Sequence, residues 1–406
     1  MSNWTETKLG SLFTVDNSKL GPHAEEPTVM SLSKYNGFVR ADDYFDKRIA
    51  SSKLDGYKVV QPGEWAFSTI HIDEGSIARN NLGETGVISP MYTTMRFVAS
   101  DCMPEYAELL VRQPGMLAEY SRRAQGSINR RRSLPFKAFA EIAIALPTPY
   151  EQRRIVDAMA AVDAQIEALE EEAAAVRHLL RCMLSDHFEL VTGDKRSVVG
   201  LCSHVIGGIW GSPEGTNETD VLALGPRIYT PATTGFVTDG SPLRSFSLKQ
   251  VEQRLVQPND IILERSGGSP EQPVGRVVIA EEGLAPCIPT DFQRLMRPDV
   301  EKVEPRYLFW RLQFDWNAGL TRAYSRRTTG ITNLSVKDYI ARDVAVPSRG
   351  EQKNLVATAD TINASLTATK TELTHLRSLR SALLTSLLDQ ESEIPDTYDT
   401  FLEGAS

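Results

Sequence analysis

The sequence predicts an α+β protein built by tandem duplication, with a long helix after each of two mixed α/β bodies. The main observation is a repeat: Leu146–Val156 returns 200 residues later as Val346–Val356, and the match runs without a gap over about fifty residues. The second observation is an apolar heptad pattern after each copy. Because internal repeats of this length define the architecture, the bodies are expected to share one topology.

The apolar pattern of the bodies predicts strands, then a helix, then a last strand. In the second body, Arg254–Leu263 is expected to form a turn leading into a buried strand, Val274–Ala280 the next strand, and Pro305–Leu312 an amphipathic helix. The counterparts in the first body are Val60–Ala66 and Pro104–Val111. Strands grouped with helices in this order predict an α+β body.

The two long helices are predicted from their apolar spacing. Each follows a Pro-x-x-x-Glu-Gln element, Pro147–Gln152 or Pro347–Gln352, whose glutamate falls in the first turn and suits the helix dipole. The first coiled-coil seam contains Ile155, Met159, Val162, Ile166, Leu169, Ala173, Val176, Leu180 and Met183. The second contains Leu355, Ala359, Ile362, Leu366, Thr369, Leu373, Leu376, Arg380, Leu383 and Leu387. Thr369 and Arg380 interrupt it, and Leu379 is expected to substitute by a local rotation.

A helix of this length cannot bury an apolar stripe alone, so two related stripes predict that the helices pack on each other. The body between them favours an antiparallel arrangement. The alternative is two separate surface helices, each lying on its own body. The expected division of the chain is 1–148 and 191–347 for the bodies, 149–190 and 348–390 for the helices, and 391–406 for an acidic tail.

The chain has 406 residues, a formal net charge of −9 and a pI near 5.4, an average that argues mildly against nucleic acid as a partner. The distribution of the charged residues along the chain changes that conclusion. Residues 1–150 hold 17 basic and 17 acidic residues, and residues 191–347 hold 18 of each. The segment 151–190 has a net charge of −5, and the segment 348–406 has a net charge of −4. The surplus therefore lies in the helices and tail, and each body can present a basic face.

Arginine clusters with interleaved hydrogen-bonding side chains predict a DNA-contacting surface on each body. The candidates in the first body are Ser121, Arg122, Arg123, Gln125, Asn129, Arg130, Arg131 and Arg132. Those in the second are Arg322, Ser325, Arg326, Arg327, Thr328, Thr329 and Asn333. Matching Tyr120–Gly126 with Tyr324–Gly330, 204 residues apart, puts the clusters at equivalent places. The alternative is a solvated loop whose arginines pair with nearby carboxylates.

No motif predicts catalysis by this chain. The glycine-rich Gly267–Arg276 lacks the Lys-Ser/Thr ending of a phosphate loop and is expected to be a hairpin connection. Asp260 and Glu264 lack the spacing of a metal-dependent nuclease core and are expected to be a turn acid and a strand-end acid. His71–Glu74 has no second histidine nearby and is expected to be a loop, so no metal site is predicted.

Four widely spaced cysteines exclude a disulfide framework or a zinc ribbon and suit a reducing compartment. The N-terminal segment lacks the apolar core of a signal peptide, and no apolar stretch is long enough for a membrane span. The expectation is a soluble cytoplasmic protein.

The duplicated Pro-x-x-x-Glu-Gln elements, the long helix after each, and the turn and strand at Gln257–Ile262 resemble the specificity (S) subunits of type I restriction-modification systems. The resemblance covers the chain apart from the tail. It implies two target-recognition domains, each reading one half of a bipartite asymmetric DNA site. It also implies an antiparallel coiled coil that fixes their separation with approximate two-fold symmetry.

The resemblance further implies a non-catalytic chain that works through partners. Two methyltransferase subunits would dock on the helical regions and supply S-adenosylmethionine chemistry, and restriction/translocase subunits would bring the ATP- and Mg²⁺-dependent reactions. No cofactor is expected in this chain. The rivals are a coiled-coil scaffold that uses the same duplicated frame without binding DNA, and a nuclease acting alone.

Overall fold

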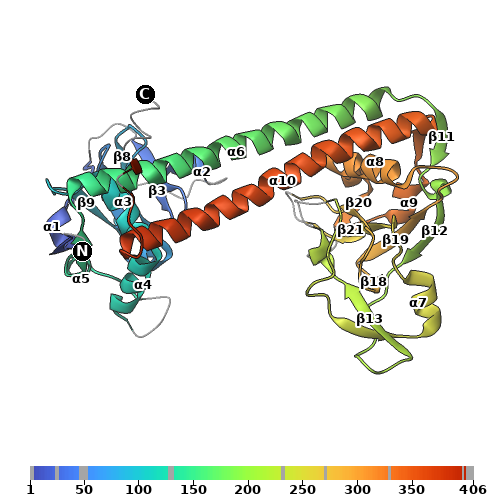
Figure 1. Ribbon diagram of the computed structural model, residues 1–406, viewed down its shortest axis with the longest axis horizontal. Helices are drawn as coiled ribbons and strands as arrows, with labels where there is room; N and C mark the ends of the chain where they lie inside the picture. The colour runs from blue at the N-terminus through green and yellow to red at the C-terminus, as the bar shows by residue number, and fades with distance from the viewer. Residues whose placement is uncertain are drawn as a thin grey trace. The chain divides into compact units, whose positions relative to one another are not determined.

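The structure is a computed structural model, and it describes residues 4–22, 27–44, 54–126, 132–229, 234–268, 272–327, 331–395 and 397–398. The chain forms two compact units: residues 1–167 together with 375–406, and residues 168–374. Each unit contains one body and one end of each of two long helices, α6 (Pro149–Leu190) and α10 (Arg349–Leu388), which are labelled in Figure 1. The predicted α+β duplication with a long helix after each body is confirmed.

The first body is formed by short strands and helices between residues 5 and 146. Its strands are β1 (Thr5–Lys8), β2 (Phe13–Val15), β3 (Thr28–Ser33), β4 (Gly37–Arg40), β5 (Lys58–Val60), β6 (Trp65–Ser68), β7 (Ile77–Arg79), β8 (Gly86–Ile88), β9 (Tyr92–Phe97) and β10 (Ala143–Leu146). Its helices are α1 (Leu9–Leu12), α2 (Ala41–Tyr44), α3 (Pro104–Arg112), α4 (Pro114–Arg123), α5 (Phe136–Ala140) and the 3-10 turn η1 (Ile72–Glu74).

Among the described residues, the second body has a similar order of elements, with additions and without a strand in the place of β5. Its strands are β11 (Asp194–Ser197), β12 (Cys202–Gly207), β13 (Thr219–Leu224), β14 (Leu243–Phe246), β15 (Ile261–Glu264), β16 (Ser266–Gly267), β17 (Val277–Ile279), β18 (Cys287–Pro289), β19 (Gln293–Pro298), β20 (Ser325–Arg327), β21 (Thr332–Leu334) and β22 (Asp343–Val346). Its helices are α7 (Leu248–Arg254), α8 (Pro305–Asn317), α9 (Val336–Ala341) and the 3-10 turns η3 (Val199–Leu201), η4 (Pro226–Ile228) and η5 (Leu320–Tyr324).

The sheets of the two bodies correspond, except that among the described residues the second body has no strand in the place of β5. The main sheet has the order β2-β9-β6-β7 in the first body and β12-β19-β15-β17 in the second. The adjoining sheets, β4-β3-β8-β5 and β14-β13-β18, each contain a parallel pair, β3 with β8 and β13 with β18. In both bodies the strand that precedes the long helix pairs antiparallel with the first strand of its unit, β10 with β1 and β22 with β11.

The turn before the buried central strand shows why the repeat is visible in sequence. In the first body, the N–H of Gln61 donates to the Glu64 carboxylate at 2.8 Å, and the N–H of Gln257 donates to Asp260 at 2.8 Å in the second. All four residues of β15 are buried, as the apolar run predicts. The next strand begins at Val277 because Gly275 has a φ of +106°, outside the strand region.

The Pro-x-x-x-Glu-Gln element forms the start of each long helix. Thr148 and Ser348 donate from their backbone N–H to Glu151 and Glu351, and each glutamate N–H donates back to the hydroxyl, which makes a capping box. The following glutamine is buried. Gln152 donates to the carbonyls of Pro147 and Asp101, both at 2.9 Å, and accepts from the N–H of Met103 at 2.7 Å. The motif thereby ties α6 to the start of α3.

Gln352 repeats this arrangement in the second unit. Its side chain donates to the carbonyl of Pro347 at 2.8 Å and accepts from the N–H of Glu304, immediately before α8, at 2.8 Å. Helix α8 in turn lies beside α10, where Arg306 pairs with Asp360 at 2.7 Å (Figure 1). A buried amide with both ends bonded fixes each long helix to its body.

The helices pair antiparallel inside each unit. In the first, the beginning of α6 and the end of α10 share one apolar cluster through Ile155, Met159, Leu384 and Leu387. In the second, the end of α6 and the beginning of α10 do so through Leu180, Leu184, Leu355 and Ala359. These clusters also contain the core of the respective body. The alternative of two separate surface helices is therefore wrong.

The second seam departs from the prediction at one place. Arg380 keeps its seam position, half-buried, and pairs with Asp163 of α6, whereas Leu379 is 55% exposed. No local rotation brings Leu379 into the seam, because the ion pair satisfies Arg380 where it stands. Thr369 is buried, and its hydroxyl donates to the carbonyl of Ser365 at 3.1 Å.

Candidate nucleic-acid interface

The arginine cluster of the second body lies on a small antiparallel sheet with the order β16-β21-β20. Arg326 is opposite Asn333 and Arg327 is opposite Thr332. Both arginines are exposed, and within the described parts of the chain neither guanidinium has a hydrogen bond or an ion pair. Because successive side chains of a strand alternate, they project from opposite faces of β20. Two unpaired guanidinium groups are free to bind phosphate or a base edge.

The other candidates of this cluster support the sheet. The hydroxyl of Ser325 donates to the carbonyl of Thr321 at 2.7 Å, and Asn333 accepts from the hydroxyl of Ser266 at 2.5 Å. Arg322 lies in η5 and is exposed. Thr328 and Thr329 lie outside the described residues. Ser325 and Asn333 therefore hold the arginine-bearing strand in place through bonds within the protein.

In the first body, Arg122 and Arg123 lie in the last turn of α4 and share one carboxylate. Arg122 donates to Glu119 from Nε at 2.8 Å and from Nη2 at 2.7 Å, and Arg123 also pairs with Glu119. Hydrogen bonding from Arg122 lowers the pKa of Glu119, so the carboxylate stays ionised. In the chain alone, both arginines therefore pair with a carboxylate, which is the alternative to DNA contact that the sequence left open.

Arg132 closes the end of α4. Its Nη2 donates to the carbonyls of Ser121 at 2.8 Å and Ala124 at 2.9 Å, two groups that the helix leaves without partners. Gln125 forms an antiparallel bridge with Ser133. Asn129, Arg130 and Arg131 lie outside the described residues. Arg132 thus has a structural role, and Gln125 is held in place by its pairing with Ser133.

The arginines of the two clusters differ in local structure, helical at Arg122 and a strand at Arg326. The match 204 residues apart is supported at its first residue, since the ring of Tyr120 lies 5.9 Å from Phe139 and that of Tyr324 lies 5.5 Å from Tyr339. The N–H of Leu134 donates to the carbonyl of Thr69 and that of Leu334 to the carbonyl of Arg265, both at 2.8 Å, which aligns the segments at 200 residues. Ser133 is bridged to Gln125 and Asn333 is paired with Arg326. The structural counterpart of Arg326 is therefore Gln125. After the tyrosine, the Tyr-Ser-Arg-Arg segment is helical in the first body and a strand in the second.

The structure brings together two arginines that sequence reasoning missed. Arg265 follows β15, and Arg294 lies on the neighbouring strand β19, opposite Leu263. Burial, and then the positive charge of Arg265, lower the pKa of Arg294, while Asp291 opposes them. Two guanidinium groups that repel each other beside the Arg326 sheet favour an incoming phosphate.

No sequence signal joins Arg265 and Arg294, because they are isolated residues whose proximity comes from the β15–β19 ladder. The corresponding ladder in the first body has threonine at both places: Thr93 lies opposite Phe67, and Thr69 precedes the turn η1. Only an alignment of the two bodies in structural register could have shown this difference. Among the described residues, it makes the second body the more basic of the two at these ladder positions.

The residues that resemble catalytic motifs have structural roles. Asp260 and Glu264 are almost fully buried and pair with Arg297 at 2.7 Å and Arg276 at 2.5 Å. His71 contacts Glu74 at 3.1 Å in the exposed turn η1. Among the described residues, no group of three or more His, Cys, Asp or Glu side chains could hold a metal ion. Over the same residues, no helix is long and apolar enough to cross a membrane.

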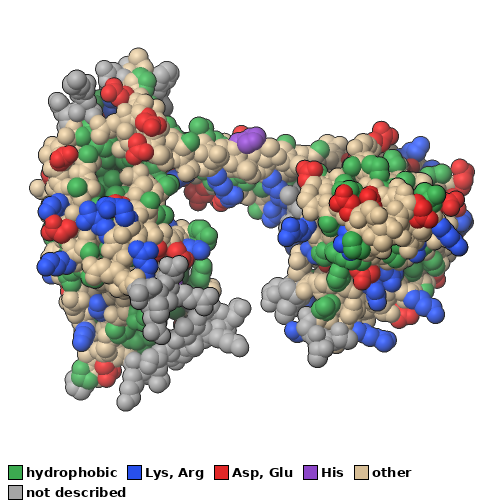
Figure 2. Space-filling model, turned by 90° about the horizontal axis from the view of Figure 1, so that it is seen from below, with side chains coloured by type: hydrophobic (Ala, Val, Ile, Leu, Met, Phe, Trp, Pro, Cys, Tyr) green, Lys and Arg blue, Asp and Glu red, His purple; other side chains and the backbone are tan. Residues whose placement is uncertain are grey.

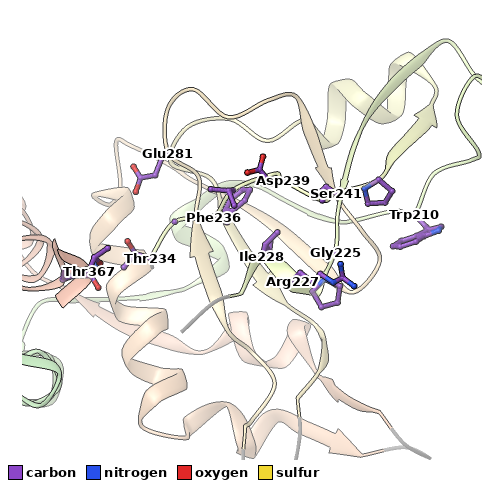
Figure 3. A pocket seen from close by; sticks show the side chains of 16 residues that line it. Trp210, Gly225, Arg227, Ile228, Thr234, Phe236, Asp239, Ser241, Glu281 and Thr367 are labelled. Atoms are coloured by element: carbon purple, nitrogen blue, oxygen red, sulfur yellow. Dashed lines mark hydrogen bonds between the residues drawn. The ribbon is translucent and has the colours of Figure 1, made fainter. Parts of the chain in front are cut away.

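A cavity of about 850 Å³ in the second unit is a further concave site. Figure 3 shows Trp210, Gly225 and Arg227 at one end and Glu281, Thr234 and Thr367 at the other, with Phe236 and Ile228 between them. Two carboxylates, Asp239 and Glu281, also line it. Their charge opposes a phosphate backbone, so this cavity is not part of the candidate interface.

The charges on the two bodies are mixed. On the face drawn in Figure 2, the Lys and Arg side chains of the described residues lie among acidic and apolar ones and form no continuous basic field there. This agrees with the equal numbers of basic and acidic residues in 1–150 and 191–347. DNA contact would therefore depend on a few placed arginines, such as Arg326, Arg327, Arg265 and Arg294, rather than on the average charge.

Solved structures with the same fold match almost the whole chain. One is a chain from a structure on complex assembly and conformational transition of the type I restriction-modification system, at 17% identity over 95% of this chain and 97% of that chain, with a TM-score of 0.59. Another is the type I restriction-modification S subunit from M. genitalium, at 14% identity over 97% of each chain, with a TM-score of 0.53.

A third match is the HsdS subunit from Thermoanaerobacter tengcongensis, at 18% identity over 95% of this chain and 96% of that chain, with a TM-score of 0.44. The sequence matches no protein-family model and no curated protein sequence. The first two structures show that the chain has the duplicated fold of a type I system, so the resemblance found in the sequence is confirmed at the level of the fold.

Proposed function

We propose that this chain is the DNA sequence-recognition subunit of a type I restriction-modification complex. Each body would read one half of a bipartite asymmetric site and direct methylation and restriction by partner subunits. The observation that carries the proposal is the shared fold over 95–97% of the chain. The proposed recognition domains are 1–148 and 191–347, the helical spacers 149–190 and 348–390, and the tail 391–406.

The different edges of the two bodies support an asymmetric site. Beside the strand of Arg326 and Arg327, which is expected to contact phosphate, the second body carries Arg265 and Arg294 where the first body has Thr69 and Thr93. Arginine with asparagine and glutamine suits both phosphate contact and base-edge readout. Because these side chains differ between the copies, the two half-sites would differ as well.

The long helices would bind the protein partners. Leu179 on α6 and Leu379 on α10 are 56% and 55% exposed and are 200 residues apart, so they are the same residue of the repeat. An exposed leucine at equivalent positions would bind two copies of one partner, here the two methyltransferase subunits. Restriction/translocase subunits would complete the assembly. In this proposal the partners supply S-adenosylmethionine, ATP and Mg²⁺ chemistry, this chain contributes no catalytic residue, and the complex acts in the cytoplasm.

The test is methylome sequencing of cells that carry the methyltransferase partner with and without this chain. The expected result is an interrupted, asymmetric methylated sequence that appears only when the chain is present. Exchanging the second body for that of another such protein should change one half of the motif and leave the other. The absence of any motif dependent on the chain, together with no sequence-specific DNA binding by the assembled complex, would refute the proposal and favour a scaffold.

A further inference from the structure

The connection between β3 and β4 of the first body is a tight turn, residues 34–36, which we call the hairpin tip. Ser33 pairs with Gly37 across the two strands, and Gly37 has a φ of +65°, a conformation that glycine adopts without strain. The side chains of Lys34, Tyr35 and Asn36 are exposed. Tyr35 is 75% exposed, and among the described residues its hydroxyl has no hydrogen bond. The hairpin tip therefore presents an aromatic ring and a hydroxyl to solvent.

The backbone of the hairpin tip is held by side chains of the same body. Ser33 Oγ accepts from the N–H groups of Tyr35 and Asn36, both at 3.2 Å. Arg112, the last residue of α3, donates from Nη2 to the carbonyls of Lys34 at 2.8 Å and Tyr35 at 3.1 Å. An exposed aromatic side chain on a fixed backbone has few rotamers to order when it binds, so little conformational entropy is lost.

The hairpin tip lies at the edge of the first body where the candidate interface begins. The turn that joins β6 to β7 connects the two. At its start, the carbonyl of Thr69 accepts from the N–H of Leu134, which follows the bridge between Gln125 and Ser133. At its end, Gly75 is so close to the hairpin tip that a Cβ on it would lie 3.3 Å from the carbonyl oxygen of Lys34. This is the edge at which the second body carries Arg265 in the place of Thr69.

The charge of the hairpin tip is nearly balanced. Lys34 Nζ lies 3.8 Å from the carboxylate of Glu74 and 5.1 Å from the centroid of the Tyr35 ring. Both charged side chains are about half exposed, so the pair adds little stability, but it leaves little net charge to attract phosphate. What the hairpin tip offers to DNA is the ring and hydroxyl of Tyr35 and the amide of Asn36, and groups of this kind contact base edges.

The corresponding connection of the second body differs in length and composition. Strands β13 and β14 correspond to β3 and β4, because each pair is antiparallel and both β3 and β13 have a parallel strand on their other side. Their connection comprises residues 225–242 instead of 34–36. It begins where the carbonyl of Gly225 accepts from the Gln293 side chain at 3.1 Å, next to Arg294. In both bodies the connection therefore starts at the candidate interface, and in each it carries different side chains.

We propose that Tyr35 contacts a base of the half-site that the first body reads and so helps to select that half-site. The inference rests on the proposed function and deepens it, since it names a side chain of the first body that selects sequence. A protein surface is the other class of partner that an exposed tyrosine suits. The position of the hairpin tip beside the Thr69 turn favours DNA, because the proposed docking residues for the protein partners lie on α6 and α10.

The experiment compares Tyr35→Ala with the wild type in the complex with the methyltransferase partner. Methylome sequencing gives the motif, and the exchange of the second body assigns one half of it to the first body. Fluorescence anisotropy then measures the affinity for duplexes with single base-pair changes in either half. We expect Tyr35→Ala to reduce discrimination about tenfold at one or two base pairs of the first half. Discrimination in the second half and the salt dependence of binding should not change.

Val98→Ala is the matched control in the same body. Val98 is 55% exposed and follows Phe97, which pairs with Phe13 at the end of β9 opposite Tyr92. This variant should keep both halves of the motif and the affinity of the wild type. Because Tyr35 and Val98 are both exposed, the thermal unfolding midpoints of the two variants should match that of the wild type.

Wild-type discrimination at both halves in the Tyr35 variant would overturn the inference and leave the proposed function standing. An equal loss of affinity for all duplexes would also overturn it, because Tyr35 would then contact the DNA backbone. So would an unchanged motif with the loss of a partner subunit in light scattering, since Tyr35 would then lie at a protein interface. If the wild type itself directs no motif, the proposed function fails and the inference fails with it.

Discussion

Arg380 of α10 and Asp163 of α6 form an ion pair in the first unit, with Arg380 Nη2 2.7 Å from Asp163 Oδ2. The pair occupies a heptad position at which neighbouring positions of the seam are apolar. The side chains are 29% and 47% exposed, so solvent screens their attraction. The pair therefore specifies which residues of the two helices face each other more than it stabilises them.

We expect Asp163→Ala to lower the stability of the first unit by about 1 kcal/mol, because it leaves a half-buried guanidinium unpaired. Arg380→Leu should instead keep or raise the midpoint of thermal unfolding, since leucine restores the apolar seam. Circular dichroism melts of the two variants measure the difference. If Arg380→Leu destabilises the chain more than Asp163→Ala, the ion pair has a larger role than its exposure indicates.

Gln152 should be among the most sensitive polar residues of the first unit. Gln152→Ala removes three hydrogen bonds from a fully buried site and leaves the N–H of Met103 and two carbonyls without partners. The expected loss is about 3 kcal/mol, which corresponds to about 10 °C in the unfolding midpoint. Gln125→Ala, at an exposed position of the same body, is the control. Equal melting of the two variants would contradict this role of the buried glutamine.

Arg326 and Arg327 should contribute to DNA affinity without selecting sequence. We expect Arg326→Ala or Arg327→Ala to weaken binding by the assembled complex about tenfold on all sequences. The slope of log K against log salt should fall by about one for each lost phosphate contact. Fluorescence anisotropy at several salt concentrations, on cognate and unrelated duplexes, measures both effects.

Arg132→Ala is the informative control for these two arginines. Its guanidinium bonds the carbonyls at the end of α4, so its loss should lower stability and leave the salt slope unchanged. If both β20 variants bind every duplex as the wild type does, at every salt concentration, then β20 is not part of the interface.

His187 should make the second unit sensitive to mild acid. Burial lowers the pKa of its imidazole from the usual 6.5, the positive charge of Arg311 adds to this, and Glu351 opposes it; Nε2 lies 3.2 Å from the Tyr307 hydroxyl. The unfolded chain therefore binds a proton more readily than the folded one. Stability is complete above pH 6.5 and falls as the pH drops from 6.5 toward the folded-state pKa.

The prediction is that His187→Gln reduces the difference between the unfolding midpoints at pH 7.5 and pH 5.5. His375→Gln, an exposed histidine of α10, should leave that difference as in the wild type. Differential scanning calorimetry at both pH values is the measurement. If the His187 variant keeps the pH dependence of the wild type, the group that makes unfolding sensitive to pH is another residue.

The architecture was predictable because its signals are periodic or repeated. The heptad spacing predicted α6 and α10, and the Pro-x-x-x-Glu-Gln elements predicted where they begin. The repeat also identified the turn before β6 and β15, since Glu64 and Asp260 accept the same backbone hydrogen bond. These features depend on neighbours in sequence, which a sequence shows directly.

The candidate interface was predictable only in part because it depends on long-range pairing. Nothing in sequence shows that Arg132 turns back to the end of α4 or that Arg294 lies beside Arg265 across a ladder. The match of Arg122 with Arg326 does not show that one segment is helical and the other a strand, because four similar residues carry too little information about local structure. Contacts between distant strands decide which arginines are free.

Leu179 and Leu379 offer the sharpest test of how partners bind. Both are more than half exposed, at equivalent positions of the repeat, so each is expected to lie at the centre of one partner interface. Leu179→Asp or Leu379→Asp should weaken the corresponding docking event by at least about thirtyfold, which is about 2 kcal/mol. Light scattering of the purified assembly should show one partner subunit lost in each single variant and both in the double variant.

Leu190→Asp is the matched control, because Leu190 is exposed on α6 but its repeat counterpart is Gln390. It should leave the stoichiometry at two partner subunits. All of these side chains are exposed, so the unfolding midpoint of the isolated chain should change little in each variant. Full stoichiometry in the Leu179→Asp and Leu379→Asp double variant would show that the partners bind another face of the helices, and a loss confined to one leucine would show that the two copies dock differently.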